Sequence, residues 1–155
     1  MTKIEYLSDF PIFTEMVACW LYDEFIVGQR PGVTYENMLE AVKKSNKTEL
    51  PVRLIALSDG NCAGTVSIVG NDLRCRSYTP WLASLYVRPP FRKNKIGEQL
   101  MERVKQIVRE LGYDELYLRT EHTGDYYRQR NWQHVETCID DEFQLETEVF
   151  CVSLN

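Results

Sequence analysis

The spacing of apolar residues changes from strand-like to helical early in this chain. Residues 2–7 alternate apolar and polar positions, which predicts a short strand. In residues 10–25 the apolar positions recur at helical spacing, and Ser8 or Asp9 could cap that helix. A second helix is expected to begin at Thr34. The first third of the chain therefore predicts one strand followed by two helices.

The next part of the chain has the pattern of paired strands. Residues 52–58 and 62–69 are rich in apolar and β-branched residues, and residues 59–61, Asp-Gly-Asn, form a compact turn between them. This arrangement predicts a β-hairpin. Residues 70–81 show no periodicity, so we expect an exposed loop there.

The longest predicted helix follows a strand that prolines bring to an end. The strand covers residues 82–87, and Pro89 and Pro90 stop its continuation because proline has no N–H group for a strand ladder. Residues 96–111 then place their apolar side chains on one helical face, and Gly112 lies just past the end.

The last third of the chain predicts more strands around a short helix. We expect a strand at residues 114–121, a helix at residues 125–130, and an antiparallel hairpin made of residues 134–139 and 143–154. The element order is β-α-α-β-β-β-α-β-α-β-β. It predicts one α/β (α+β) domain over residues 1–155, with a mixed, mostly antiparallel sheet of six or seven strands and about four helices on both faces.

Composition narrows the classes of function. The 155 residues are 44% hydrophobic, which is enough for the core of one domain, and the net charge is −5. An acidic chain is a poor partner for nucleic acid or an anionic membrane surface, and it accommodates a cationic partner more easily. No apolar stretch reaches the ~20 residues of a membrane span. We therefore expect no nucleic acid and no membrane among the partners.

The cysteines indicate a reducing compartment. They are odd in number, widely spaced and without a Cys-x-x-Cys pair, which argues against a disulfide framework and against a zinc site. We accordingly expect a cytoplasmic location and no metal. The five residues are Cys19, Cys62, Cys75, Cys138 and Cys151.

The stretch LYVRPPFRKNKIG, residues 85–97, joins a predicted strand to the longest predicted helix. The first N–H groups of a helix have no partner within it, and together with the helix dipole they can bind an anion. Arg92, Lys93 and Lys95 add positive charge, and Gly97 allows close approach to the backbone. Such cations could simply be solvated in an exposed turn. Their position before a helix, where positive charge is unfavourable, favours a bound anion instead.

The longer run LASLYVRPPFRKNKIGEQLMERV, residues 82–104, resembles the signature of the GNAT superfamily of acyl-CoA N-acyltransferases. In that signature a strand ending in Val-x-Pro is followed by Gln/Arg-x-x-Gly-x-Gly/Ala and a helix. Arg92 stands at the first motif position and Gly97 at the last, whereas Lys95 replaces the middle glycine. We expect Lys95 to have ordinary right-handed backbone geometry, because a left-handed lysine would cost about 1 kcal/mol relative to glycine.

The resemblance implies acetyl-CoA as the acyl donor. Its pyrophosphate would rest on the amides from Arg92 to Gly97, and its pantetheine arm would pair like an extra strand beside Leu85–Val87. The residues predicted to bind the donor are Leu85, Tyr86, Val87, Arg92, Lys93, Asn94, Lys95, Ile96, Gly97 and Glu98.

The stretch GDYYRQRNW, residues 124–132, is similar to the Phe/Tyr-Tyr-x-x-x-Gly-Phe pattern of the same superfamily. Asn131 stands in place of the glycine and can end a helix in a similar left-handed conformation. The resemblance implies that Tyr127 protonates the departing thiolate as a general acid, whereas Tyr126 is expected to pack. The alternative is that both tyrosines are core aromatics.

An amine acceptor must also lose a proton before it can attack. Glu121 and His122 lie at the end of the predicted fifth strand, and Glu24 lies near the end of the first helix, which lines the acceptor cleft in this family. Glu121 is the predicted base, although none of the three has a diagnostic spacing. Each of them alone could instead be an ordinary surface charge.

Two large aromatics are predicted to help Glu24 form the acceptor site. Tyr78 and Trp81 flank Pro80 in the predicted loop and could hold an amine against their rings, although aromatics beside a proline are often loop anchors. Acidic residues near the predicted cleft would suit a cationic amine. They are Asp23, Glu24, Asp72 and Glu121.

These features predict an N-acetyltransferase that moves an acetyl group from acetyl-CoA to a primary amine by direct attack in a ternary complex. The amine could belong to a small molecule, a peptide N-terminus or a lysine. One alternative is a non-catalytic acyl-CoA-binding domain. Another is a nucleic-acid module that uses the RKNK stretch, but the chain lacks the extended basic face and interleaved aromatics of such modules. The sequence is compatible with either a monomer or a homodimer.

Overall fold

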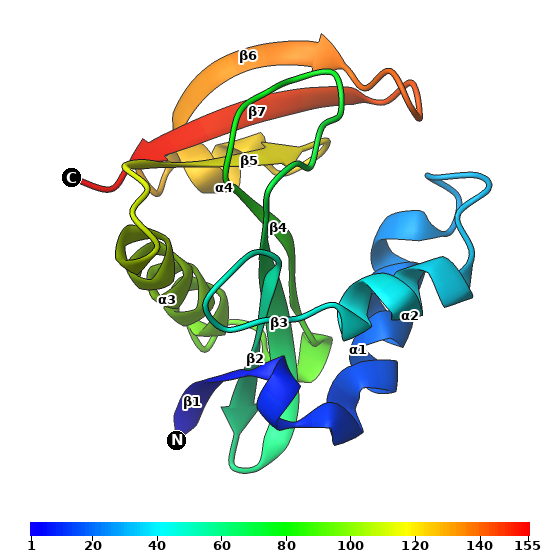
Figure 1. Ribbon diagram of the computed structural model, residues 1–155, viewed down its shortest axis with the longest axis vertical. Helices are drawn as coiled ribbons and strands as arrows, with labels where there is room; N and C mark the ends of the chain where they lie inside the picture. Colours follow the sequence, from blue (N-terminus) through cyan, green and yellow to red (C-terminus); the bar gives the residue numbers. More distant parts are fainter.

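A computed structural model describes residues 1–155 and has a single seven-stranded sheet at its centre (Figure 1). The strands are β1 (Thr2–Tyr6), β2 (Val52–Ser58), β3 (Asn61–Val69), β4 (Trp81–Val87), β5 (Glu115–Thr120), β6 (Gln133–Ile139) and β7 (Glu146–Ser153). Their order across the sheet is β1-β2-β3-β4-β5-β7-β6. All neighbouring strands are antiparallel except β4 and β5, which run parallel. The predicted mixed, mostly antiparallel sheet is confirmed.

Helices cover both faces of the sheet, as predicted (Figure 1). The α-helices are α1 (Thr14–Leu21), α2 (Tyr35–Lys43), α3 (Ile96–Glu110) and α4 (Gly124–Arg128), and short helical turns are η1 (Leu7–Asp9), η2 (Pro11–Phe13), η3 (Tyr22–Ile26) and η4 (Pro89–Phe91). Successive side chains of a strand point to opposite faces. In β2, Leu54 accordingly packs in one core cluster with residues of α3, and the next residue, Ile55, packs in another with residues of α1.

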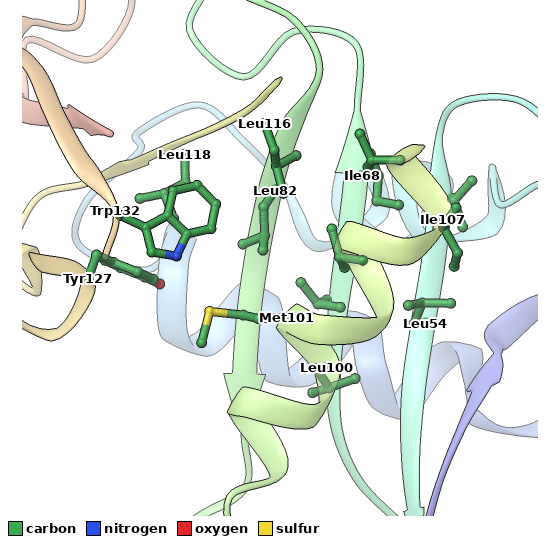
Figure 2. Packing of buried hydrophobic residues seen from close by; sticks show 14 of the residues in the cluster. Leu54, Ile68, Leu82, Leu100, Met101, Ile107, Leu116, Leu118, Tyr127 and Trp132 are labelled. Atoms are coloured by element: carbon green, nitrogen blue, oxygen red, sulfur yellow. The ribbon is translucent and has the colours of Figure 1, made fainter. Parts of the chain in front are cut away.

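The larger hydrophobic core lies between α3 and the sheet (Figure 2). Leu100, Val104 and Ile107 are fully or almost fully buried on the inner face of α3. Burial of such side chains contributes roughly 1.5–3 kcal/mol each. This packing holds the start of α3 against the end of β4, so it positions the loop that joins them.

The first predicted helix is interrupted. It consists of the short turns η1 and η2, then α1, and then the π-helical turn η3. The backbone at Phe10 has φ −134° and ψ 61°, which is not helical, and Pro11 starts a new turn after it. The expectation that Ser8 or Asp9 caps one continuous helix was therefore wrong, and no side chain caps η1, η2 or α1.

The start of the second helix is confirmed. Thr34 Oγ1 accepts a hydrogen bond of 3.0 Å from the backbone N–H of Asn37, and Asn37 Oδ1 accepts one of 2.9 Å from the N–H of Thr34. This reciprocal arrangement is a capping box. The predicted hairpin is also present, with Asp59 and Gly60 at positive φ in its turn. None of the helices has the length and apolar composition of a membrane span.

Candidate active site

Strands β4 and β5 separate at the centre of the sheet. Their ladder consists of a single parallel pair, Trp81 with Tyr117, and no pairing follows it. On β4, Ser84 has φ 55°, and the register with β3 shifts in the same region. Such a bulge bends a strand and ends its pairing. The C-terminal half of β4 therefore has an unpaired edge on the side of β5.

A cavity of about 960 Å³ lies where the two strands separate. It is lined by residues of β4, the start of α3, the end of β5, α4 and η3, so segments far apart in the sequence build one site. The cavity wall includes most of the predicted site residues, namely Glu24, Asp72, Leu85, Tyr86, Val87, Arg92, Lys93, Lys95, Ile96, Gly97, Glu98, Glu121, His122 and Tyr127. The predicted residues outside its wall are Asp23, Tyr78, Trp81 and Asn94.

The loop before α3 has a backbone conformation that the sequence did not predict. Lys93 and Lys95 both have left-handed backbones, with φ 67° and 61°, so the expectation of right-handed geometry at Lys95 was wrong. Alternation of left-handed and other residues turns successive N–H groups toward one side and forms a concave anion site. None of the N–H groups from Lys93 to Glu98 donates a hydrogen bond within the protein. The left-handed turns leave a row of free donors beside three cationic side chains.

Gly97 lies under a tyrosine of α4. A Cβ atom at Gly97 would stand 3.3 Å from the hydroxyl of Tyr126, which is tighter than an ordinary contact. Tyr126 is held there by Arg130, whose guanidinium lies 3.6 Å from the centre of the tyrosine ring and forms an ion pair of 3.1 Å with Glu98 of α3. Tyr126 thus packs as predicted and also lines the cavity.

Tyr127 is almost entirely buried, with 8% of its surface exposed. Its ring meets Trp132 and Phe150 at centroid distances of 6.1 and 6.2 Å, and Figure 2 shows it beside Trp132 at the edge of the core. Burial raises the pKa of Tyr127 to about 12, with a further contribution from Tyr126. The phenol therefore keeps its proton at neutral pH.

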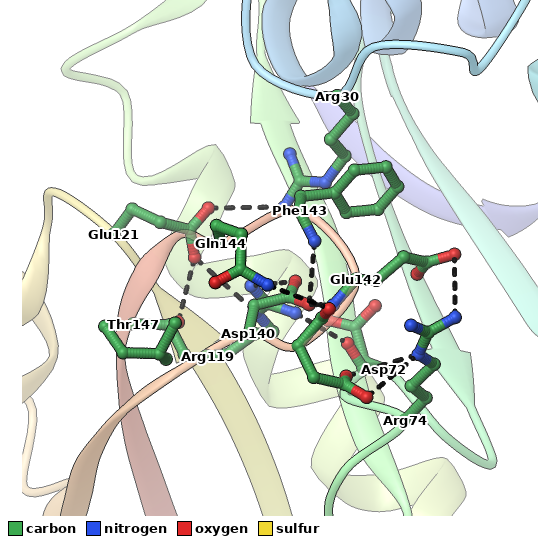
Figure 3. Close-up of polar contacts among 12 residues, drawn as sticks. Arg30, Asp72, Arg74, Arg119, Glu121, Asp140, Glu142, Phe143, Gln144 and Thr147 are labelled. Carbon is green, nitrogen blue, oxygen red and sulfur yellow. Dashed lines mark hydrogen bonds and ion pairs between the residues drawn. The ribbon is translucent and has the colours of Figure 1, made fainter.

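Glu121 lies in a network of buried charges at the ends of β5 and β7 (Figure 3). Its carboxylate forms ion pairs with Arg30 at 3.3 Å and Arg119 at 3.5 Å. It also accepts a hydrogen bond of 2.9 Å from the hydroxyl of Thr147. The carboxylate is only 13% exposed. Both of its oxygens are engaged, so the protein already holds this carboxylate in place by three contacts.

Arg119 connects this network to the loop between β3 and β4. Its guanidinium forms an ion pair of 2.8 Å with Asp140 and donates a hydrogen bond of 3.1 Å to the backbone carbonyl of Asp72. Asp72 lines the cavity, and no hydrogen bond or ion pair engages its carboxylate within the protein. Burial raises the pKa of Asp72 to about 6, while Arg119 and Arg30 act in the opposite direction.

Tyr78 and Trp81 are the aromatic residues that the structure does not bring to the cavity. Trp81 is fully buried and packs with Leu73 and Val149 in a small core cluster. Tyr78 stacks on Tyr117 at a centroid distance of 4.8 Å. Both rings therefore anchor the loop between β3 and β4. Trp81 is the first residue of β4 and packs into the core, and Tyr78 packs against the same cluster.

A sequence model described as the Acetyltransferase (GNAT) family matches residues 14–134. The chain belongs to this family. The match extends from α1 to the start of β6, so it includes every segment that lines the cavity. A search of curated proteins found no match.

Solved structures of GNAT proteins share this fold at low sequence identity. A GNAT acetyltransferase from Staphylococcus aureus Mu50 is 15% identical with a TM-score of 0.74, and the alignment covers 100% of both chains. An aminoglycoside 6′-N-acetyltransferase complexed with coenzyme A has the same identity and TM-score over 99% of this chain and 97% of its own. A putative acetyltransferase from Salmonella typhimurium with acetyl-CoA is 15% identical, with a TM-score of 0.71, over 100% of this chain and 95% of that one.

Two positions depart from the GNAT sequence pattern, and the structure accounts for both. Lys95 adopts the left-handed conformation that the usual glycine would adopt with less strain. Asn131 has φ 68° and lies three residues after Arg128, the last residue of α4, in the left-handed conformation expected of a residue that replaces a glycine near a helix end. At both positions a residue with a side chain holds a left-handed backbone conformation that glycine adopts more easily.

The sequence did not predict the two arginines that contact Glu121. Arg30 lies in the irregular segment after η3, and Arg119 is the next-to-last residue of β5. Neither belongs to a recognisable motif. Both line the cavity of this GNAT protein and bind Glu121. The one sequence signal for Arg119 is a charged residue directly after the apolar run Leu116–Leu118. Nothing in the sequence indicates that Arg30 reaches it.

Proposed function

We propose that this protein transfers an acetyl group from acetyl-CoA to a primary amine by direct attack in a ternary complex. The observation that carries the proposal is the row of unpartnered N–H groups from Lys93 to Glu98, which lies beside three cations and at the end of an unpaired strand edge. A diphosphate fits such donors, and the amides of a pantetheine arm fit a free strand edge.

On the donor side, Arg92, Lys93 and Lys95 supply the positive charge that a diphosphate requires. All three are exposed at the mouth of the cavity, which suits contact with the charged end of a donor. Arg92 is already oriented, because its Nε donates a hydrogen bond of 2.8 Å to the carbonyl of Val87. Acetyl-CoA would supply an activated thioester beside Leu85–Val87.

Tyr127 is the proposed general acid that protonates the departing thiolate. It lines the cavity, and its phenol carries a proton at neutral pH that it can donate to the thiolate as this leaves. The acceptor amine could belong to a small molecule, a peptide N-terminus or a lysine. Glu24 and His122 also line the cavity and remain proposed acceptor-side residues.

The test is a panel of primary amines incubated with acetyl-CoA, with release of free thiol as the readout. We expect amine-dependent thiol release for at least one member and an acetylated amine by mass spectrometry. Binding of acetyl-CoA without acetylation of any amine would contradict the proposal and would favour a non-catalytic acyl-CoA-binding domain.

A further inference from the structure

The charged network around Arg119 contains one more carboxylate than it has guanidinium groups. Asp72, Glu121 and Asp140 supply three negative charges, whereas Arg30 and Arg119 supply two positive ones. Figure 3 shows that these side chains come from different segments and meet at one place. When all three carboxylates are ionised, this part of the cavity carries one uncompensated negative charge.

The uncompensated charge belongs to Asp72. Asp140 is paired with Arg119 at 2.8 Å, and Glu121 is held by Arg30, Arg119 and Thr147. Arg119 contacts only the backbone carbonyl of Asp72, so the carboxylate of this cavity-lining residue has no hydrogen-bond or ion-pair partner within the protein. A partly buried carboxylate without a partner is costly. A ligand cation at this point would remove that cost.

We propose that Asp72 binds the ammonium group of the acceptor and takes its proton, so that the acceptor is an aliphatic primary amine that is charged at neutral pH. This inference rests on the proposed function. It assigns the base to a residue of the loop between β3 and β4 in place of Glu121, which acts as a positioning residue for Arg30 and Arg119.

The proposed reaction moves protons at two residues of the protein, Asp72 and Tyr127. The ammonium group gives one proton to the Asp72 carboxylate, and the freed nitrogen lone pair forms the new bond to the acetyl carbonyl carbon. The carbon–sulfur bond then breaks, and its electron pair stays on sulfur. The thiolate takes a proton from Tyr127, while the nitrogen loses its second proton to solvent, from which Tyr127 is reprotonated. Asp72 finally releases its proton to solvent.

The environment of Asp72 suits such a base. The charged groups that face it are Arg119 and Glu121 from β5 and its end, Arg30 from the segment after η3, and Asp140 from the turn after β6. Burial is the largest influence on its pKa, which is raised to about 6. A base with a pKa near the working pH is ionised often enough to act and still basic enough to accept a proton.

The test compares Asp72→Asn with wild type and with Asp114→Asn on an acetylated amine of the panel, over a range of pH. Asp114 is exposed and does not line the cavity, so it is a matched control. For Asp72→Asn we expect turnover at about pH 7 to fall at least ~10-fold with unchanged acetyl-CoA affinity. The deficit should narrow as the pH approaches the amine's pKa of about 10, because free amine then needs no base.

The wild-type protein should also lose kcat/KM as the pH falls through about 6, since protonation of Asp72 removes the base, and Asp72→Asn should lack this step. Wild-type turnover in Asp72→Asn, or a deficit that does not change with pH, would overturn the role of Asp72. The role of Asp72 would also be overturned if Glu121→Gln, and not Asp72→Asn, showed a loss of turnover that depends on pH. Absence of acetyl transfer by the wild type to every amine would instead contradict the proposed function.

Discussion

At the residue scale, Lys95 holds a backbone conformation that glycine adopts at much lower cost. A left-handed residue with a Cβ atom is strained by roughly 1–2 kcal/mol, and Lys95 has φ 61° directly before α3. The strain is accompanied by a gain for the site, because the turn directs free N–H groups to one side and the side chain adds a positive charge. Stability and ligand binding therefore make opposite demands on this position.

Replacing Lys95 with glycine should increase stability. Relief of strain exceeds the added entropy of the unfolded chain, so we expect a gain of about 0.5–1 kcal/mol in the free energy of unfolding. Chemical denaturation measures it. Gln106→Gly is the control, because Gln106 is an exposed residue within the right-handed helix α3, where a change to glycine should cost about 1 kcal/mol. Equal losses in both variants would contradict the left-handed assignment.

The buried phenol of Tyr127 leads to a second prediction. Tyr127→Phe should lower turnover at least ~10-fold and leave acetyl-CoA affinity nearly unchanged, since the hydroxyl acts on the departing thiolate and not in binding. Because burial raises the pKa of Tyr127 to about 12, the deficit should be the same from about pH 7 to about pH 9. Steady-state kinetics and calorimetry measure both quantities.

Tyr113→Phe is the control for this measurement, because Tyr113 is only partly buried and lies outside the cavity wall. It should have wild-type turnover. If Tyr127→Phe also retained the wild-type rate, Tyr127 would have no part in the proton transfer and would be a core aromatic alone.

Some residues of the site could be predicted because their roles depend on local sequence. The cations of residues 92–95 and Tyr127 stand within recognisable motifs, and the structure brings them to one cavity. Asp72 was predicted only as one of several acidic residues near the cleft, and Arg30 and Arg119 were not predicted. Their contacts join segments up to 91 residues apart, as in the hydrogen bond between Arg30 and Glu121, and no local spacing records such contacts.

At the element scale, the close approach of β3 to β4 depends on one glycine. A Cβ atom at Gly64 would stand 2.8 Å from the carbonyl oxygen of Tyr86 and 3.4 Å from the side chain of Leu100. The carbonyl of Tyr86 belongs to the backbone, so it cannot move aside as the end of a flexible side chain could. Gly64 therefore fixes how far β4 lies from β3, and with it the position of the strand edge that lines the cavity.

Gly64→Ala should therefore destabilise the protein by roughly 1–3 kcal/mol, the usual cost of overpacking a core. Gly70→Ala is the matched control, since a Cβ atom at Gly70 would meet nothing within 4 Å. It should change the free energy of unfolding by less than about 0.5 kcal/mol. Thermal or chemical denaturation of the two variants separates them, and equal stability would contradict the tight contact between β3 and β4.

The elements themselves were largely predictable from periodicity. The hairpin of β2 and β3 and the amphipathic helix α3 have strong patterns, and their stability depends on the same apolar faces that the sequence displays. The first helix was predicted as continuous because its apolar residues keep a helical spacing through residues 10–25. Periodicity does not record that the backbone breaks at Phe10 and changes to a π-helical turn at Tyr22.

At the scale of the whole molecule, the two sides of the cavity carry opposite charges. Arg92, Lys93 and Lys95 follow the end of β4, whereas Asp72 and Glu121 lie around Arg119 of β5. The fold creates this separation, because β4 and β5 pair only at their start and then leave each other. An anionic donor and a cationic acceptor could thus occupy one cavity without competing for the same charges.

The central claim is that the N–H groups from Lys93 to Glu98 hold a diphosphate while a thioester lies along the free edge of β4. A crystal structure of the protein with coenzyme A tests it most directly. We expect the diphosphate oxygens to accept hydrogen bonds from these N–H groups and the pantetheine arm to run beside Leu85–Val87. Coenzyme A bound with its diphosphate away from these N–H groups, or a cavity filled by the protein's own side chains, would contradict the account.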